Sequence, residues 1–482
     1  MEALTASGLA KRIYKRSNKR KKPCQLLLSA SLEQTGMNKF VQWRGKGYPF
    51  STDAILDRLL ANFINSGEAQ EVSFRELVPW MKVGERATHY IHSYPAKLLP
   101  HIAHFFLASD RVCPLSGRVL DPFSGTGTVA LEAMLSGREA FYADANPLAR
   151  LITSAKTTLV SEKDLTEAFK QCLSDFKKNR TRSHPEIVNI EHWYTPETIK
   201  HLSRLKAAIG HQPSGIIKDF LLVTFSAITR KSSLADPRLS VPVKIKDYPG
   251  RRDRKSISVI DFFSEQFESN LKRMRELSAM DSGTHRPCLA GKDARRLVVE
   301  SGQPLASSSI DLVITSPPYA GAQKYIRATS LNLGWLEYAK PCELRGLEDQ
   351  NIGREHIPKQ KYMSFSSTGI DEADKILRNV YEVNPLRASI ASTYLIEMRQ
   401  ALTEVFRVLK PGGQLVLVIG NNIVCGHEFM SSDYLLEICE SLGMELRLKL
   451  IDSIKSRGLM TKRNKTASLI TREWVLVLRK II

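Results

Sequence analysis

One stretch of the sequence, residues 119–135, constrains the fold more than any other. A short apolar strand ends at Asp121, a turn with two glycines follows, and an apolar helix comes after the turn. Glycine permits the positive φ that such a turn requires and lets a ligand approach the backbone closely. A strand, a turn and a helix in this order predict one unit of a mostly parallel α/β sheet.

A second predicted strand, residues 141–143, ends in Asp144 roughly 20 residues after Asp121. In doubly wound nucleotide-binding folds an acidic residue at this place holds the ribose hydroxyls. The turn lacks the Gly-Lys-Ser/Thr ending of a Walker loop and the glycines typical of pyrophosphate binding. The sequence therefore favours a nucleoside ligand such as S-adenosylmethionine. Asp293, which follows a third predicted strand, is a candidate acceptor for the adenine amine.

The run Thr-Ser-Pro-Pro-Tyr at residues 315–319 follows an apolar strand. Two adjacent prolines fix φ at both positions and remove two backbone N–H donors. The carbonyls of Ser316 and Pro317 then become acceptors, and Tyr319 offers a flat aromatic face beside them. This arrangement suits a planar ring that carries an exocyclic amine. For the run taken alone, a stiff Pro-Pro turn is the alternative interpretation.

Together these stretches resemble the amino-methylating DNA methyltransferases, which use S-adenosylmethionine to modify cytosine N4 or adenine N6. The glycine-rich turn resembles their cofactor motif I, and residues 316–319 resemble their catalytic motif IV. Residues 92–100 resemble the motif X helix, which contacts the methionine end of the cofactor. The resemblance covers roughly residues 88–160 and 288–480. It implies a Rossmann-like class I methyltransferase fold, α/β with a mostly parallel sheet.

The resemblance also implies roles for individual residues, and none of them is a metal ligand. The catalytic residues are Ser316, Pro317, Pro318 and Tyr319. The cofactor-binding residues are Tyr94, Pro95, Lys97, Asp121, Pro122, Phe123, Ser124, Gly125, Thr126, Gly127, Thr128, Asp144, Ala145, Asn146, Asp293 and Ala294.

The chemistry of the target explains the catalytic set. An aromatic amine is a poor nucleophile because its lone pair is delocalised into the ring. Ser316 Oγ and the Pro317 carbonyl are expected to accept the amine hydrogens during direct methyl transfer. Tyr319 is expected to stack on a base that has been flipped out of the duplex. Many adenine methylases carry Asp or Asn where this chain has Ser316. Within this family, serine at this position favours cytosine N4 as the target.

The expected product is therefore N4-methylcytosine in duplex DNA, in a restriction-modification or related defence setting. Three alternatives stay open: adenine-N6 methylation of DNA, methylation of an RNA amine, and a non-catalytic nucleic-acid-binding protein built on this fold. An RNA enzyme would usually bring an RNA-binding module, which residues 1–90 do not display. A non-catalytic protein should have lost Asp121, the turn glycines or the residues at 316–319, and all of these are present.

Charge points to a polyanionic partner, here double-stranded DNA. Seventy Lys and Arg against fifty Asp and Glu leave a net charge of +20. Much of this excess is concentrated at residues 11–22, 251–255 and 455–465. The seven cysteines form no CxxC pair, which fits a reducing compartment. No apolar run approaches the ~20 residues of a membrane span. We expect a cytoplasmic, nucleoid-associated protein with no membrane or metal partner, and a cognate restriction endonuclease is the protein partner that the resemblance implies.

Four parts are predicted along the 482 residues. Residues 1–40 form a basic flexible arm and residues 41–87 an N-terminal helical segment. The catalytic domain comprises residues 88–160 and 288–482, with its first strand near Val119 and its last at 474–478, after a long loop. Residues 161–287 form a helical insert that is a candidate target-recognition region, with helices at 165–176, 199–209 and 217–228. Residues 340–390 are a rival for that role.

Overall fold

A computed structural model describes residues 48–95, 97–181, 183–244, 258–280, 286–321, 324–453 and 471–481. Its centre is an eight-stranded sheet with the order β1-β9-β10-β6-β5-β2-β3-β4. The strands are β1 (Gln70–Val72), β2 (Arg118–Asp121), β3 (Glu139–Ala143), β4 (Cys288–Gly291), β5 (Ile310–Thr315), β6 (Leu409–Ile419), β9 (Met444–Ser453) and β10 (Arg472–Lys480). A separate hairpin contains β7 (Asn422–Val424) and β8 (His427–Phe429).

The direction of the strands fixes where a ligand can bind. All strands of the large sheet run parallel except β10, which is antiparallel to both of its neighbours, β6 and β9. The carboxyl ends of the seven parallel strands therefore share one edge, where ligands bind in open α/β sheets. Because β10 is reversed, its first residues lie at this same edge. The predicted α/β class with a mostly parallel sheet is confirmed.

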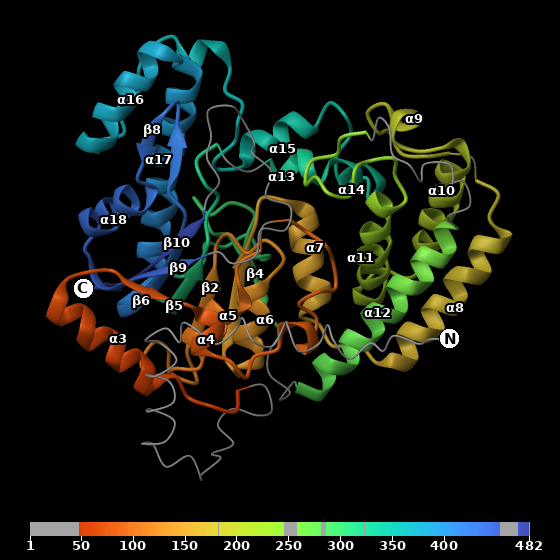
Figure 1. Ribbon diagram of the computed structural model, residues 1–482. Coiled ribbons are helices and arrows are strands. Elements are labelled where there is room, and N and C mark those ends of the chain that lie inside the picture. Colours follow the sequence, from red (N-terminus) through yellow and green to blue (C-terminus); the bar gives the residue numbers. More distant parts are fainter. Residues whose placement is uncertain are drawn as a thin grey trace, which may run out of the picture.

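Helices cover both faces of the sheet (Figure 1). Alternate residues of β5 enter two different buried clusters: Leu312 and Ile314 join one, and Val313 joins the other. One face carries α3 (Asp53–Ser66), α4 (Phe74–Leu77), α5 (Pro100–Leu107), α6 (Thr128–Leu135) and α7 (Pro147–Lys156). The other carries α16 (Asp371–Val383), α17 (Pro385–Val408) and α18 (Ser431–Ser441). Strands buried on both faces read as nearly continuous apolar runs, as β5 and β6 do.

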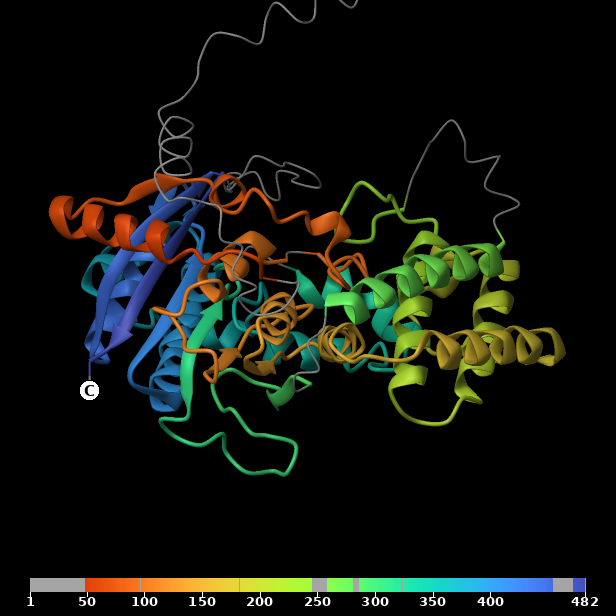
Figure 2. The same ribbon diagram turned by 90° about the horizontal axis from the view of Figure 1, so that it is seen from below.

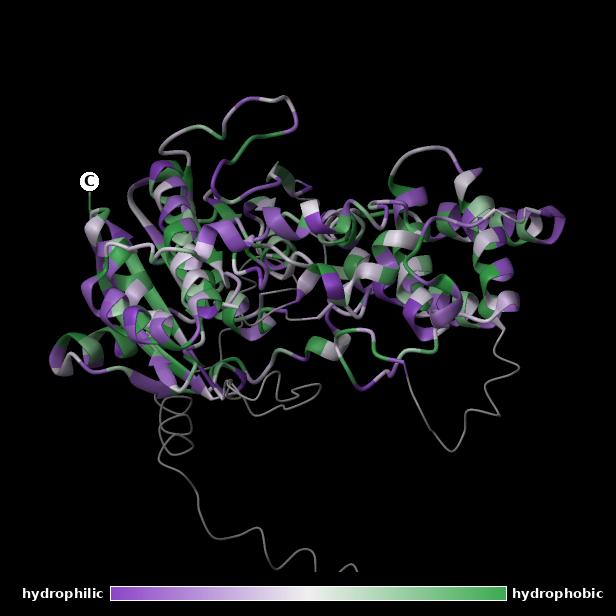
Figure 3. Ribbon diagram, turned by 90° about the horizontal axis from the view of Figure 1, so that it is seen from above, coloured by the Kyte–Doolittle hydropathy of each residue, from purple (hydrophilic) through white to green (hydrophobic). Residues whose placement is uncertain are grey.

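The insert is helical, as predicted. It contains α8 (Glu162–Lys178), α9 (Ile190–Trp193), α10 (Pro196–Gly210), α11 (Ile216–Lys231) and α12 (Val259–Met280). The three predicted helices lie inside α8, α10 and α11, whereas α12 was not predicted. Figures 1 and 2 show these helices gathered at the end of the molecule away from β9 and β10. Apolar and polar patches alternate on them in Figure 3, as expected for amphipathic helices.

The insert is tied to the catalytic part by a buried polar contact. Asn332, on α14 (Ser330–Trp335), donates to the Ser226 carbonyl of α11 at 2.9 Å and to the Thr229 hydroxyl at 3.2 Å. The Ser226 hydroxyl lies 3.2 Å from His92 Nε2. Since α14 follows the Pro-Pro run closely along the chain, these bonds hold the insert next to the candidate catalytic segment. Two further short helices near that segment are α13 (Tyr325–Ala328) and α15 (Leu344–Gln350).

Three sequence predictions about secondary structure are wrong. The sheet does not begin near Val119, because β1 pairs in parallel with β9 and adds a strand from the segment predicted to be helical. The stretch before the last strand is not a long loop, since it contains α18 and β9. Residues 92–99 are not helical, and α5 begins only at Pro100. Proline disfavours a helical conformation of the residue before it, and it is tolerated in the first turn of a helix.

Several predictions concern residues outside the described part of the chain. The basic arm at 1–40 and the basic groups at 251–255 and 455–465 all lie there.

A buried charged cluster joins the N-terminal segment to helix α6. Glu132 is completely buried, and its carboxylate accepts from Arg86 at 2.6 and 2.7 Å and from the Tyr48 hydroxyl at 2.7 Å. His89 Nε2 lies 2.7 Å and His104 Nδ1 3.3 Å from the same carboxylate. Burial opposes the charge on Glu132, but the ion pair with Arg86 and the hydrogen bonds hold its pKa well below the ordinary value.

Candidate active site

The glycine-rich turn has the geometry of a ligand cradle. Gly125 and Gly127 have φ of +50° and +70°. A Cβ on Gly127 would lie 2.5 Å from Thr153 Cγ2 of α7, so this glycine permits close packing between the turn and α7. A Cβ on Gly125 would meet nothing within 4 Å, so this side of the turn is open. The Ser124 hydroxyl is buried and has no hydrogen-bond partner among the described residues. An open backbone beside an unsatisfied hydroxyl fits a polar ligand.

The two carboxylates expected at the cofactor have different surroundings. Asp121 is 3% exposed, and it accepts from the Thr315 hydroxyl at 2.7 Å and from the Phe123 amide at 3.1 Å. Asp144 is half-buried, and it accepts from the amides of Gly125 and Asn146, each at 2.8 Å. Asp121 therefore joins the ends of β2 and β5, whereas Asp144 is the carboxylate with a side available to a ligand. The ribose contact of Asp144 stays a prediction.

Burial raises the pKa of Asp121 to about 7 and the pKa of Asp144 to about 6. The hydrogen bonds that the two carboxylates accept act in the opposite direction but are outweighed. A carboxylate that binds ribose hydroxyls must be ionised to accept two hydrogen bonds. Cofactor affinity is therefore expected to fall as the pH drops through about 6. Asp144→Asn should weaken cofactor binding by about 1–3 kcal/mol at pH 8. The affinity of this variant for the cofactor should also depend less on pH than that of the unmodified protein.

Calorimetric titration with S-adenosylmethionine at pH 8 and pH 5.5 measures both effects. Glu71→Gln, which changes an exposed carboxylate on β1, is the matched control and should bind like the unmodified protein. Equal affinity of Asp144→Asn and the unmodified protein at pH 8 would remove Asp144 from the cofactor site.

The Pro-Pro segment lies where the sequence placed it, directly after β5. Pro317 is buried, while Ser316, Pro318 and Tyr319 are half-buried. The Thr315–Asp121 bond at 2.7 Å joins the start of this segment to the start of the glycine-rich turn. The two sequence motifs, nearly 200 residues apart, are thus neighbours at one edge of the sheet.

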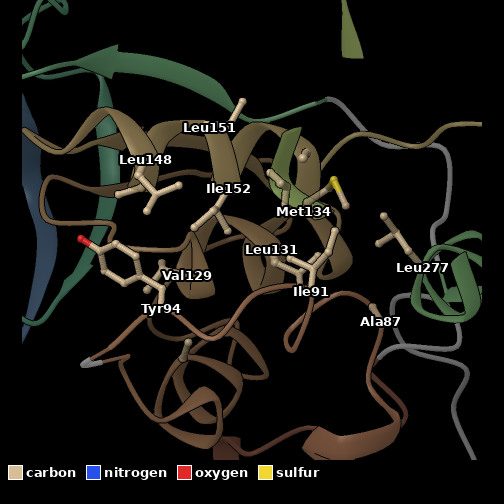
Figure 4. Packing of buried hydrophobic residues seen from close by; sticks show 14 of the residues in the cluster. Ala87, Ile91, Tyr94, Val129, Leu131, Met134, Leu148, Leu151, Ile152 and Leu277 are labelled. Carbon is tan, nitrogen blue, oxygen red and sulfur yellow. The ribbon is translucent and has the colours of Figure 1, made fainter. Parts of the chain in front are cut away.

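Tyr94 and Asn146 link three candidate segments. Asn146 caps α7 by accepting from the Leu148 amide, and its Nδ2 donates to Tyr94 Oη at 3.0 Å and to Thr329 Oγ1 at 3.2 Å. Tyr94 is 5% exposed and belongs to the apolar cluster that also contains Val129 of α6 (Figure 4). This network holds the motif X stretch, the end of β3 and the segment after β5 together.

Lys97, the other candidate of the motif X stretch, donates to the His92 carbonyl. Burial lowers the pKa of Lys97 to about 8, and the charge of Arg273 acts in the same direction. Lys156, on α7, is completely buried and lies 3.5 Å from Thr126 Oγ1 of the glycine-rich turn. Burial holds the pKa of Lys156 well below its ordinary value.

Asp293 lies at the end of the sheet next to Asp144. The strands that precede these residues pair in parallel, with Ala143 opposite Gly291. The Asp293 carboxylate accepts from Arg295 at 2.8 and 2.9 Å, and Arg295 also bonds to Glu397 at 2.9 Å. An Asp293 held in this way keeps further lone pairs, and its contact with the adenine amine stays a prediction.

The structure adds site residues that the sequence did not indicate, among them Thr315, Thr329, Lys156, Asn422 and Glu473. Thr315 was predicted to be the first residue of the run at 315–319, with no role of its own, and in the structure it is the last residue of β5. Asn422 and Glu473 stand far from any motif in the sequence. In the structure the Tyr319 hydroxyl donates to Glu473 Oε1 at 2.7 Å, and Asn422 Nδ2 donates to the Ala320 carbonyl at 3.0 Å. Among the residues that the structure describes, no group of three or more His, Cys, Asp or Glu side chains could hold a metal ion. No described helix is both long and apolar enough to span a membrane.

Comparison with known proteins gives relatives of low identity. No protein-family model matches the chain. The chain is 21% identical over 437 residues to the Type II methyltransferase M.MvaI of Kocuria varians, which covers 82% of this chain and 91% of the relative. It is 22% identical over 433 residues to the Type II methyltransferase M.BsoBI of Geobacillus stearothermophilus, which covers 80% and 84% respectively.

Two solved structures show similarity at low identity and low TM-score. A SAM-dependent methyltransferase from Methanosarcina mazei is 10% identical with a TM-score of 0.29, and 80% of this chain and 100% of that chain are covered. The rRNA methyltransferase aviRa from Streptomyces viridochromogenes is 12% identical with a TM-score of 0.33, and 85% and 97% are covered. Because these TM-scores are below 0.5, the fold assignment rests on the strand order itself.

Proposed function

We propose that this protein is a DNA methyltransferase that transfers a methyl group from S-adenosylmethionine to the exocyclic amine of a base, with cytosine N4 as the favoured target. The observation that carries the proposal is the bond between Thr315 and Asp121, 2.7 Å long. It brings a segment suited to an aromatic amine against a turn suited to a nucleoside cofactor. The two relatives named as Type II methyltransferases support methyl transfer.

The cofactor is S-adenosylmethionine, and the residues present fit it. Gly125 leaves an open backbone, Ser124 supplies an unsatisfied hydroxyl, and Asp144 supplies a half-buried carboxylate for the ribose. When bound, the cofactor supplies an electrophilic methyl group on a sulfonium. The protein contributes orientation, exclusion of water and acceptors for the hydrogens of the target amine.

Ser316 Oγ and the Pro317 carbonyl accept hydrogen bonds from the target amine, and Tyr319 stacks on the flipped base. Ser316 is the reason for favouring cytosine N4, and adenine N6 is the second candidate. The net charge of +20 favours a polyanionic substrate, and duplex DNA is favoured over RNA because the sequence of residues 1–90 displays no recognisable RNA-binding module. The basic arm and the basic cluster of the insert are proposed to hold DNA through its phosphates. A site-specific role in restriction and modification, with a cognate endonuclease and a nucleoid location, belongs to the same proposal.

Mass spectrometry of nucleosides tests the reaction. DNA from cells that express the protein is expected to contain N4-methylcytosine, and DNA from cells that express Ser316→Ala is not. N6-methyladenine alone would overturn the choice of base and keep the mechanism. Methylated RNA together with unmodified DNA would overturn the class of substrate. Long-read sequencing of the same DNA then gives the sequence that surrounds each modified base.

A further inference from the structure

The segment at residues 350–355 packs against the catalytic turn, residues 316–320. A Cβ on Gly353 would lie 3.1 Å from the Tyr319 carbonyl oxygen and 3.2 Å from Pro318 Cβ. Gly353 also has φ of +78°, which glycine adopts without steric cost. An alanine at this position would therefore be strained in itself and would press on the turn. The segment and the turn are close enough that a change in one displaces the other.

Two further features hold the same side of the segment. Lys324, which follows the catalytic turn, forms an ion pair of 2.9 Å with Glu355. Ile352 is 4% exposed and belongs to the buried apolar cluster that also contains Ala320. The stretch after β5 is thus attached to the segment by close packing, a shared apolar cluster and an ion pair.

The other side of the segment is joined to the end of the sheet that carries Asp293. Arg295 donates to the Gln350 carbonyl at 3.1 Å. The same guanidinium donates to the Asp293 carboxylate at 2.8 Å and to Glu397 Oε1 at 2.9 Å. One arginine therefore contacts the candidate adenine acceptor, the beginning of the segment and a carboxylate of α17.

Glu397, on α17, binds both sides at once. Arg354 of the segment donates to both oxygens of its carboxylate at 2.8 Å, in addition to the bond from Arg295. The side chains of Glu397, Arg295 and Arg354 are 12%, 20% and 11% exposed. Charge-assisted hydrogen bonds of this kind are strong and give the guanidinium groups a fixed geometry. With Asp293 included, two arginines face two carboxylates, so the network is neutral only while Glu397 is ionised.

We propose that Glu397 is a positioning residue that fixes the adenine acceptor Asp293 and the catalytic turn relative to each other. It acts through Arg295 toward Asp293 and through Arg354 toward the turn. The inference rests on the proposed function, in which the cofactor and the target base meet at these two places. Methyl transfer requires the sulfonium methyl group and the target nitrogen to be aligned, and a misplacement of about 1 Å can cost about 100-fold in rate. In this role Glu397 touches neither reactant.

Glu397→Gln tests both sides of this role, because it removes the charge that the two guanidinium groups share. With cofactor and enzyme in excess, it should slow single-turnover methylation of genomic DNA from cells that lack the protein about 10- to 100-fold. In calorimetric titration it should bind S-adenosylhomocysteine about 5- to 10-fold more weakly than the unmodified protein does. The inosine analogue of this compound, which lacks the adenine amine, should bind both proteins about equally weakly.

Glu404→Gln is the matched control for the loss of a carboxylate. Glu404 lies on the same helix, its side chain is 13% exposed, and its partners are Arg407 and the Leu297 amide. It should leave the rate and both affinities nearly unchanged.

Gly353→Ala tests the catalytic side alone and does not depend on how well Glu397→Gln folds. It should slow methyl transfer about 10- to 100-fold, because its Cβ displaces the turn, while the affinity for S-adenosylhomocysteine stays nearly unchanged. Gly302→Ala is the control for backbone strain, since Gly302 has φ of +82° and a Cβ there would meet nothing within 4 Å. That control should keep the full rate.

Four results would each overturn the positioning role of Glu397. They are a full rate in Gly353→Ala, equal losses in Glu397→Gln and Glu404→Gln, equal weakening of both compounds in Glu397→Gln, and equal affinity of the unmodified protein for the two compounds. An unmodified protein that forms no methylated nucleoside would instead overturn the proposed function, and the positioning role with it.

Discussion

Glu132→Ala is expected to lower the free energy of unfolding by about 3–5 kcal/mol, the cost of breaking a buried ion pair by removing one partner. The substitution would leave Arg86, which is 7% exposed, without its carboxylate. It would also remove the carboxylate acceptor of the completely buried Tyr48, whose hydroxyl would keep only its 3.1 Å contact with the backbone carbonyl of residue 132. Because these groups are buried, the loss should exceed that of an exposed pair several-fold.

Denaturant unfolding followed by circular dichroism measures this effect. Glu139→Ala is the matched control, because Glu139 forms an ion pair of 2.7 Å with Arg118 in which both side chains are partly exposed. Its expected loss is below about 1 kcal/mol. Similar losses in the two variants would show that the Glu132 cluster is replaceable by water or by local rearrangement.

The cluster explains why the N-terminal segment is part of the catalytic fold. Tyr48, Arg86 and His89 come from that segment, and Glu132 comes from the helix that follows the cofactor turn. No sequence pattern indicated this cluster, because Glu132 resembles an ordinary polar residue within an apolar helix. Only the three-dimensional structure reveals that Tyr48, Arg86, His89 and His104 converge on one buried carboxylate.

The parts of the fold that the sequence predicted are those with strong local signals. The strand that ends at Asp121 and the strand before the Pro-Pro run are apolar runs, and the helices of the insert have clear periodicity. Strand β9 was missed because Arg447 and Lys449 interrupt its apolar residues. Such alternation is typical of a strand near the edge of a sheet, and β1, its outer partner, has only three residues.

The candidate site likewise contains residues that could be placed from sequence and residues that could not. Residues of the two motifs could be placed from sequence because each motif follows a strand directly, and parallel strands end at one edge. Glu473 could not be placed, because its distance from Tyr319 depends on the reversed direction of β10 and on its register with β6 and β9. Asn146 was predicted as a cofactor residue, while its bonds to Tyr94 and Thr329 became visible only in three dimensions.

Ser316→Ala is expected to reduce the rate of methyl transfer by about 100- to 1,000-fold while cofactor affinity stays unchanged. Loss of one preorganised hydrogen-bonding group at the reacting centre has an effect of this size. The variant keeps both prolines and Tyr319, so the shape of the segment and the stacking surface remain. Ser316→Thr, which keeps a hydroxyl, should retain more of the rate than alanine does.

Single-turnover rates and calorimetric cofactor titration separate the two roles that Ser316 could have. Ser389→Ala is the matched control, because Ser389 on α17 is 3% exposed and its hydroxyl has no hydrogen-bond partner among the described residues. That control should keep the full rate. A Ser316→Ala protein that turned over normally would show that the Pro317 carbonyl alone accepts from the amine. A Ser316→Ala protein that lost cofactor affinity instead would move Ser316 from the target base to the cofactor.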